Sequence, residues 1–124
     1  MTHNGAMVQM SRKQFERCVE DALDEIPDDI AQHIVNVAIL VEDEPPEDEP
    51  DDLLGLYDGV ALTERDDWAE FGQLPDRIFI FRNPILDICD TPDDVVREVR
   101  ITVLHEIGHY FGLDEDRIHQ LGWG

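Results

Sequence analysis

One stretch of the chain, residues 90–112, constrains the fold more than any other. It opens with Asp90-Thr91-Pro92, where a side chain able to cap a helix precedes a proline suited to the first helical turn. Apolar residues then recur at helical spacing to the end of the stretch, where Gly112 is well suited to terminate a helix. The pattern predicts one long helix whose apolar side lies in the core, with the other elements packed around it.

Two histidines lie one turn apart on this predicted helix. Because four residues at 100° each leave the side chains of His105 and His109 about 40° from eclipse, both imidazoles can reach one ion. Zinc favours tetrahedral geometry and binds imidazole nitrogen readily. Glu106 follows the first histidine, so its carboxylate lies near the metal without having to be a ligand. In that place it can act as a general base toward a zinc-bound water.

A catalytic zinc normally has three protein ligands and one open position. Gly112 allows the chain to turn back after the helix, so the residues just beyond it are candidates for the third ligand. The candidates are Asp114, Glu115, Asp116 and His119. Glu115, ten residues after His105, ranks first, and His119, ten residues after His109, is its main rival.

The residues from His105 to Glu115 read His-Glu-Ile-Gly-His-Tyr-Phe-Gly-Leu-Asp-Glu. This segment resembles the extended motif His-Glu-x-x-His-x-x-Gly-x-x-(His/Asp) of the metzincins and the Asp-zincins. It is most similar to the small bacterial and archaeal zincin-like metallopeptidases, sometimes described as minimal zincins. Short overall length, acidic residues after Gly112 and a site close to the C-terminus belong to the same resemblance.

The resemblance implies an α+β fold: a small zincin-like domain with a mixed sheet packed on the active-site helix. It also implies an edge strand above the cleft that holds an extended peptide, for which residues 77–82 are the candidate. The family pattern assigns zinc binding to His105 and His109 and the role of general base to Glu106. It assigns the third ligand to Glu115, although the usual residue there is histidine or aspartate, and glutamate is one methylene longer.

The methionine that metzincins place beneath the metal has no counterpart after the motif. The methionines of this chain are Met1, Met7 and Met10, all of which precede the motif. Leu121 and Trp123 are the candidates to support the site in its place.

The rest of the chain predicts short elements of both kinds. Residues 1–10 are expected to form a disordered or loosely held tail, and residues 11–124 a single domain. We expect helices or helical turns at residues 11–26, 28–33 and 114–121, strands at 35–41 and 77–82, and a hairpin within 54–62.

The charge of the chain limits its partners. It has 30 acidic and 9 basic residues, for a formal net charge of −21, which repels nucleic acid and anionic membrane surfaces. Residues 42–52 consist of eight acidic residues and three prolines, and they predict a solvated loop without the residue spacing of a calcium loop. Adaptation to salt and a basic partner are both open explanations of the acidity.

Two cysteines, Cys18 and Cys89, do not make a disulfide framework. We see neither a signal peptide nor a membrane span and expect a soluble, cytoplasmic protein with reduced thiols.

These features together predict a zinc-dependent peptidase that acts on a peptide or protein, with no nucleic-acid or membrane partner. One alternative is a non-catalytic zincin-like module that binds a peptide or protein and keeps a vestigial metal site. Another is a hydrolase acting on a non-peptide amide. Glu106 favours an enzyme, because a purely structural zinc does not need it.

Overall fold

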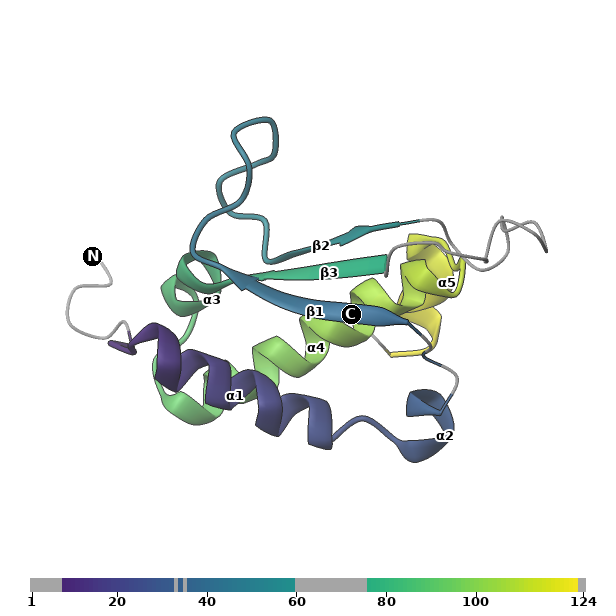
Figure 1. Ribbon diagram of the computed structural model, residues 1–124, viewed down its shortest axis with the longest axis horizontal. Helices are drawn as coiled ribbons and strands as arrows, with labels where there is room; N and C mark the ends of the chain where they lie inside the picture. Colours follow the sequence, from purple (N-terminus) through teal and green to yellow (C-terminus); the bar gives the residue numbers. More distant parts are fainter. Residues whose placement is uncertain (1–7, 33, 35, 60–75, 123–124) are drawn as a thin grey trace.

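The computed structural model describes residues 8–32, 34, 36–59 and 76–122. Within these residues the chain forms helices and strands in a mixed order (Figure 1). In sequence order the elements are α1 (Arg12–Asp24), α2 (Asp28–Ala31), β1 (Val37–Glu42), β2 (Gly55–Asp58), β3 (Asp76–Phe81), α3 (Arg82–Asp87), α4 (Pro92–Tyr110) and α5 (Glu115–Gln120).

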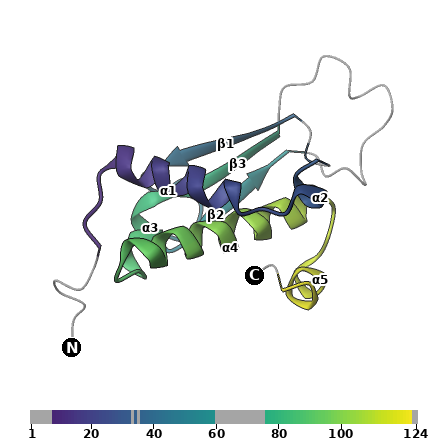
Figure 2. The same ribbon diagram turned by 90° about the horizontal axis from the view of Figure 1, so that it is seen from below.

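The strands form a mixed sheet with the order β1-β3-β2. Strand β1 runs parallel to β3, and β2 runs antiparallel to it. Helices α1 and α4 lie side by side against one face of this sheet, as the two perpendicular views show (Figures 1 and 2). The expected α+β fold, with a mixed sheet packed on the long helix, is confirmed.

The expectation that residues 77–82 form the edge strand is wrong. They correspond to β3, which lies between the other two strands. Ile78 and Ile80 of this strand are fully buried, as a central strand requires, whereas the short strand β2 occupies the edge beside α4. The chain also enters α3 directly at Arg82, and Pro84 is tolerated there because it lies in the first helical turn.

Strand β2 lies within residues 54–62, where the sequence predicts a hairpin. Its antiparallel partner is β3, which follows much later in the chain. Residues 60–62 of the expected hairpin lie outside the described residues.

Capping boxes start the two main helices. The Ser11 hydroxyl accepts from the Gln14 backbone N–H at the start of α1, and Thr91 does the same for Asp94 at the start of α4. Helix α4 then buries a row of side chains spaced four apart, on which the core of the molecule is built. This row consists of Val95, Val99, Val103 and Ile107.

The segment before α1 is held at two points. Val8 is buried and its backbone N–H donates to the Cys89 carbonyl at 3.3 Å. The Met10 carbonyl accepts from Arg82 Nη1 at 2.9 Å. Residues 1–7 of the expected tail lie outside the described part of the chain.

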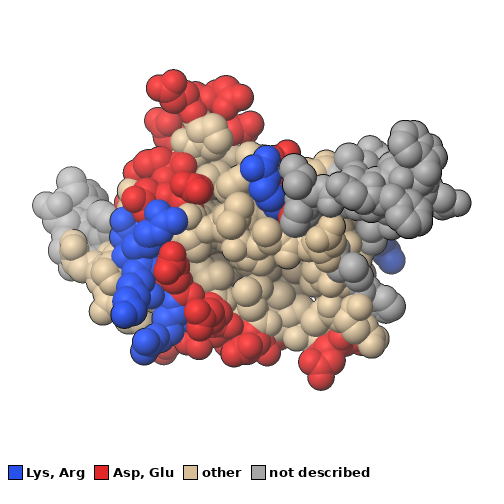
Figure 3. All heavy atoms as spheres, viewed as in Figure 1, with Lys and Arg blue, Asp and Glu red and all other residues tan. Residues whose placement is uncertain are grey.

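The acidic segment of residues 42–52 rises from the body of the molecule between β1 and β2, and its acidic side chains crowd its surface (Figure 3). Arg82 anchors the base of this segment, with Nε 2.9 Å from Asp43 Oδ1.

Both cysteines are buried and free, and burial raises the pKa of the Cys89 thiol to about 11. Among the described helices, none combines the length and the apolar character needed to cross a membrane.

Candidate metal centre

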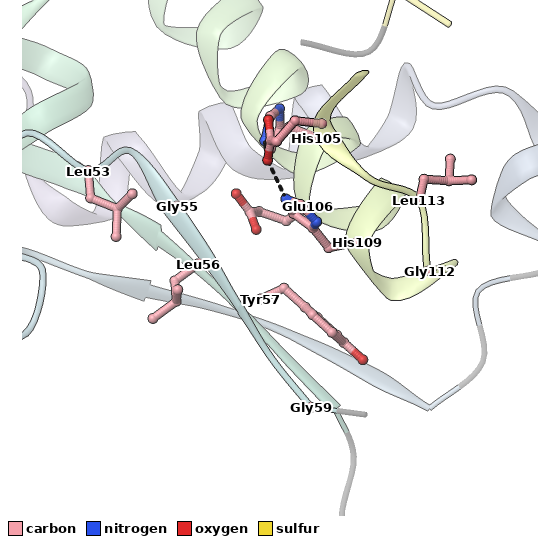
Figure 4. A pocket seen from close by; sticks show the side chains of 11 residues that line it. Leu53, Gly55, Leu56, Tyr57, Gly59, His105, Glu106, His109, Gly112 and Leu113 are labelled. Carbon is pink, nitrogen blue, oxygen red and sulfur yellow. Dashed lines mark hydrogen bonds and ion pairs between the residues drawn. The ribbon is translucent and has the colours of Figure 1, made fainter. Parts of the chain in front are cut away.

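The last two turns of α4 carry the histidine pair. The side chains of His105 and His109 are 24% and 31% exposed, and their ring centroids lie 5.1 Å apart. The two rings therefore present their Nε2 atoms to the same side of the helix, where the chain returns after its turn (Figure 4).

A Schellman turn ends α4 and reverses the chain. Gly112, at φ 85°, donates its N–H to the His109 carbonyl, and the Leu113 N–H donates to the Gly108 carbonyl, both at 2.9 Å. The left-handed conformation at this position favours glycine, as the sequence predicted. The Asp114 side chain then accepts from the Arg117 N–H at 2.9 Å and caps α5.

Glu115 begins α5 and faces the histidine pair. Its Oε2 atom lies 3.1 Å from His105 Nε2 and 2.8 Å from His109 Nε2. Among the described residues these three side chains form the cluster that could hold a metal ion, and it does not include the other three candidates. Asp114 is used as a helix cap, and Asp116 and His119 lie elsewhere on α5.

The three side chains fit a zinc ion in chemistry and in spacing. Two imidazoles and one carboxylate are common zinc ligands, and their ligand atoms all lie within 4.8 Å of one another. Bonds of about 2.0–2.1 Å at tetrahedral angles separate ligand atoms by roughly 3.4 Å. The Glu115 Oε2 atom lies 3.1 and 2.8 Å from the two imidazole nitrogens, and its side chain is 58% exposed, so it is free to shift toward this separation from them.

The ionisation of Glu115 also suits a metal. Partial burial raises the pKa of its carboxyl, but the charges of His105 and His109 and hydrogen bonds to both rings outweigh this effect. The pKa of Glu115 therefore lies below its ordinary value, which favours the ionised form that binds cations.

Glu106 is buried beside the cluster and is only 8% exposed. Burial raises the pKa of its carboxyl, and the charges of His109 and His105 oppose this only in part. A hydrogen bond from the backbone of Tyr57 on β2 also holds the carboxylate. Figure 4 shows Glu106 lying between β2 and the histidines.

Gly55 allows β2 to approach α4 closely. A Cβ atom at this position would lie 2.6 Å from Thr102 Cγ2 and 3.0 Å from the Phe79 carbonyl oxygen. The sequence pattern indicated neither this contact nor the hydrogen bond from Tyr57 to Glu106. The available signal was a glycine inside an apolar run, which often marks close backbone approach in a strand.

An open cleft of about 520 Å³ separates β2 from the turn between α4 and α5. Leu53 and Leu113 lie on either side of the histidine pair in this cleft (Figure 4). The Tyr57 hydroxyl donates to the buried Asp76 carboxylate at 2.8 Å, which fixes the ring in the cleft wall. Tyr110, which follows His109 on α4, is only 1% exposed and belongs to the core.

Strand β2 turns part of its backbone toward the cleft. The Phe81 N–H donates to the Leu54 carbonyl at 3.0 Å, so these two residues form a hydrogen-bonded pair. Antiparallel pairs alternate, and the backbone groups of Gly55 and Tyr57 therefore point away from β3. The hydrogen bond from Tyr57 to Glu106 agrees with this direction.

The fold and the site together define a small α+β domain that carries, at the end of α4, a cluster of three residues that could hold a metal ion. The sequence profile of the zincin-like metallopeptidases matches residues 34–123, and the chain belongs to this family.

A conserved hypothetical protein from Thermus thermophilus has a similar solved structure, with a TM-score of 0.54 and 23% sequence identity. The match covers 90% of this chain and 97% of that protein, and it shows a shared fold. The comparison with curated proteins gave no match.

Proposed function

We propose that the protein is a zinc-dependent peptidase, in which His105, His109 and Glu115 hold the metal and Glu106 is the general base. The observation that carries this proposal is the buried Glu106 carboxylate, which lies beside a cluster of three candidate ligands at the wall of an open cleft. A structural zinc is normally closed by four protein ligands, whereas three ligands leave a position for chemistry.

A zinc ion held by this cluster would polarise the peptide carbonyl and make a bound water acidic. Glu106 takes the proton of the attacking water at its carboxylate and passes it to the nitrogen of the leaving amine. Burial raises the pKa of Glu106, so the carboxylate is a stronger proton acceptor than an exposed glutamate. The hydrogen bond from the Tyr57 backbone orients the carboxylate for both transfers.

Strand β2 supports a peptide or protein as the substrate. The backbone groups of Gly55 and Tyr57 that point away from β3 can pair with an extended peptide chain lying in the cleft. The net charge of −21 argues against a nucleic acid as the partner. A cytoplasmic location stays a prediction from the sequence.

The substitution Glu106→Gln tests the assigned chemistry. The variant keeps its shape and its metal ligands, so we expect it to retain zinc and to lose hydrolysis by at least about 10²–10⁴-fold. Cleavage is measured by mass spectrometry on a library of mixed peptides, with zinc content measured on the same samples. Glu98→Gln, which changes another glutamate of α4 away from the cluster, is the matched control.

Unchanged turnover in the Glu106→Gln variant would contradict the role of general base. Wild-type protein that holds zinc and binds peptides but cleaves none would support the non-catalytic peptide-binding module instead.

A further inference from the structure

Strand β1 lies at the edge of the sheet opposite to β2, the strand that borders the candidate metal centre. Among the described residues its one strand partner is β3, in parallel register. The Asp76 N–H donates to the Asn36 carbonyl at 3.1 Å, so the alternation along the pair turns the backbone groups of Val37, Ile39 and Val41 away from β3. This side of β1 is therefore a free edge of the sheet.

Arg12 covers one end of this free edge. Its Nη2 atom donates to the outward-facing Val41 carbonyl, and its Nε atom lies 3.3 Å from Glu16 Oε2 on the same helix. The outward-facing backbone groups of Val37 and Ile39 have no hydrogen-bond partner among the described residues. Such unpaired N–H and C=O groups can pair with another extended chain.

A groove of about 400 Å³ lies between this edge and α1, which runs alongside β1 in both ribbon views (Figures 1 and 2). Its apolar lining includes Val19 and Leu23 of α1 and Ile39 of β1. Leu23 and Ile39 are only half-buried, so apolar surface remains uncovered beside the free backbone groups. The side chains of an added strand can bury this surface.

Acidic side chains border the groove on both sides. Glu16 and Glu20 lie one turn apart on α1, and Glu42 is the last residue of β1. Arg12 pairs with Glu16, whereas Glu20 and Glu42 are exposed and have no ion-pair partner among the described residues. Figure 3 shows acidic side chains over α1 beside a largely uncharged surface over β1. The groove therefore favours a cationic ligand.

The same charges distinguish a basic partner from a second copy of the chain. Two copies paired through β1 would bring two sets of these carboxylates together, and each chain has a net charge of −21. A partner segment with lysine or arginine at alternate positions has the complementary charge. On the side of α1, the stem of such a side chain can lie along Leu23 and its charged end beside Glu20.

We propose that the free edge of β1 binds an extended basic segment of a partner protein, which adds a strand to the sheet and fills the groove beside α1. Backbone hydrogen bonds to Val37 and Ile39 hold the segment, and Glu20 and Glu42 favour lysine or arginine in it. The site lies at the opposite edge of the sheet from the candidate metal centre and does not depend on the proposed peptidase chemistry.

Two synthetic peptides test the strand pairing. Both have the sequence Lys-Val-Lys-Val-Lys-Val-Lys-Val, and one carries methyl groups on its four central backbone nitrogens, so that neither of its edges can donate hydrogen bonds there. We expect fluorescence anisotropy in about 0.15 M sodium chloride to show micromolar binding of the unmodified peptide. The methylated peptide should bind at least about 10-fold more weakly, because its charge is kept and its backbone hydrogen bonds are lost.

Two variants with the same net charge test the position of the site. Glu20→Lys places a cation in the groove and should weaken binding of the unmodified peptide by about 5–20-fold. Glu47→Lys changes an exposed carboxylate of the acidic segment, outside the groove, and is the matched control. It should leave the affinity within about 2-fold of the wild type.

Equal affinity for the two peptides, or no binding of the unmodified one, would overturn the added strand. An equal loss of affinity in Glu20→Lys and Glu47→Lys would show that the peptide responds to net charge alone and would overturn the groove as the site. A wild-type dimer in light scattering that the peptide does not dissociate, and that Glu20→Lys does alter, would assign this edge to a second copy of the chain instead.

Discussion

The contact between Gly55 and Thr102 determines how closely the edge strand β2 approaches α4. No side chain separates the two at this point, and a single added Cβ atom would lie 2.6 Å from Thr102 Cγ2. The same approach brings the Tyr57 backbone within hydrogen-bond reach of Glu106. A residue without any chemistry of its own therefore positions the proposed base.

We predict that Gly55→Ala lowers the free energy of unfolding by about 1–3 kcal/mol, because the new methyl group overpacks against Thr102 and the Phe79 carbonyl. Urea denaturation measures this change. Adding Thr102→Ser to the variant removes Cγ2 and should restore part of the loss, while the contact with the carbonyl remains. An unchanged denaturation midpoint in Gly55→Ala would show that the strand and helix are not in tight contact.

At the scale of the elements, the Asp94 side chain holds the first turn of α4. The Asp94 carboxylate accepts from the backbone N–H groups of Asp90 at 3.1 Å and Thr91 at 3.2 Å, and it pairs with Arg97 at 2.6 Å. The backbone hydrogen bond to Asp90 and the side-chain hydrogen bond to Arg97 together hold the pKa of Asp94 below its ordinary value. The carboxylate thus stabilises the helix that carries the proposed metal site.

Because the pKa of Asp94 is lowered, the stability that its carboxylate contributes changes with pH in one direction. Since the pKa of Asp94 is lower in the folded state, its contribution is present above the unfolded-state pKa of about 3.9 and is lost as the pH falls through the folded value. We predict that Asp94→Asn is less stable than wild type at neutral pH and that the difference shrinks in acid. Asp93→Asn removes an equal charge from the same turn as the control. A difference in unfolding free energy that is independent of pH would contradict this account.

Local signals allowed α1, α2, α4, α5 and most of the cluster to be predicted from the sequence, whereas the helix α3 at Arg82–Asp87 was not expected. Thr91 and Gly112 mark the ends of α4 through hydrogen bonds to near neighbours, and helical spacing alone places His105 and His109 on one side. The turn at Gly112 likewise pointed to Glu115.

Contacts between distant parts of the chain were not predictable in this way. The order of the strands depends on which segments pair, and no local pattern places β3 at the centre or β2 at the edge. The roles of Gly55 and Tyr57 arise only when β2 meets α4, about 50 residues further along the chain.

At the scale of the whole molecule, the dominant property is a net charge of −21 on 124 residues. Self-repulsion of this size opposes the compact state, and salt screens it because the Debye length falls from about 10 Å at 0.1 M to about 3 Å at 1 M. The projecting acidic segment concentrates part of this charge (Figure 3).

We predict that the Tm of the metal-free protein rises as sodium chloride is increased from about 0.1 M to about 1 M, measured by differential scanning calorimetry. The double substitution Glu47→Gln/Asp48→Asn neutralises two exposed carboxylates of the acidic segment and should reduce this dependence on salt. A Tm that falls with added salt would mean that favourable ion pairs outweigh the repulsion.

The metal content of the purified, zinc-reconstituted protein tests the central claim most directly. We predict about one zinc ion per chain in the wild type and in His119→Ala, and loss of the metal in Glu115→Ala, because Glu115 faces both histidines and His119 lies outside the cluster. Elemental analysis of the three proteins gives the answer. No zinc in the wild type, or equal zinc in the Glu115→Ala variant, would contradict the proposed metal centre.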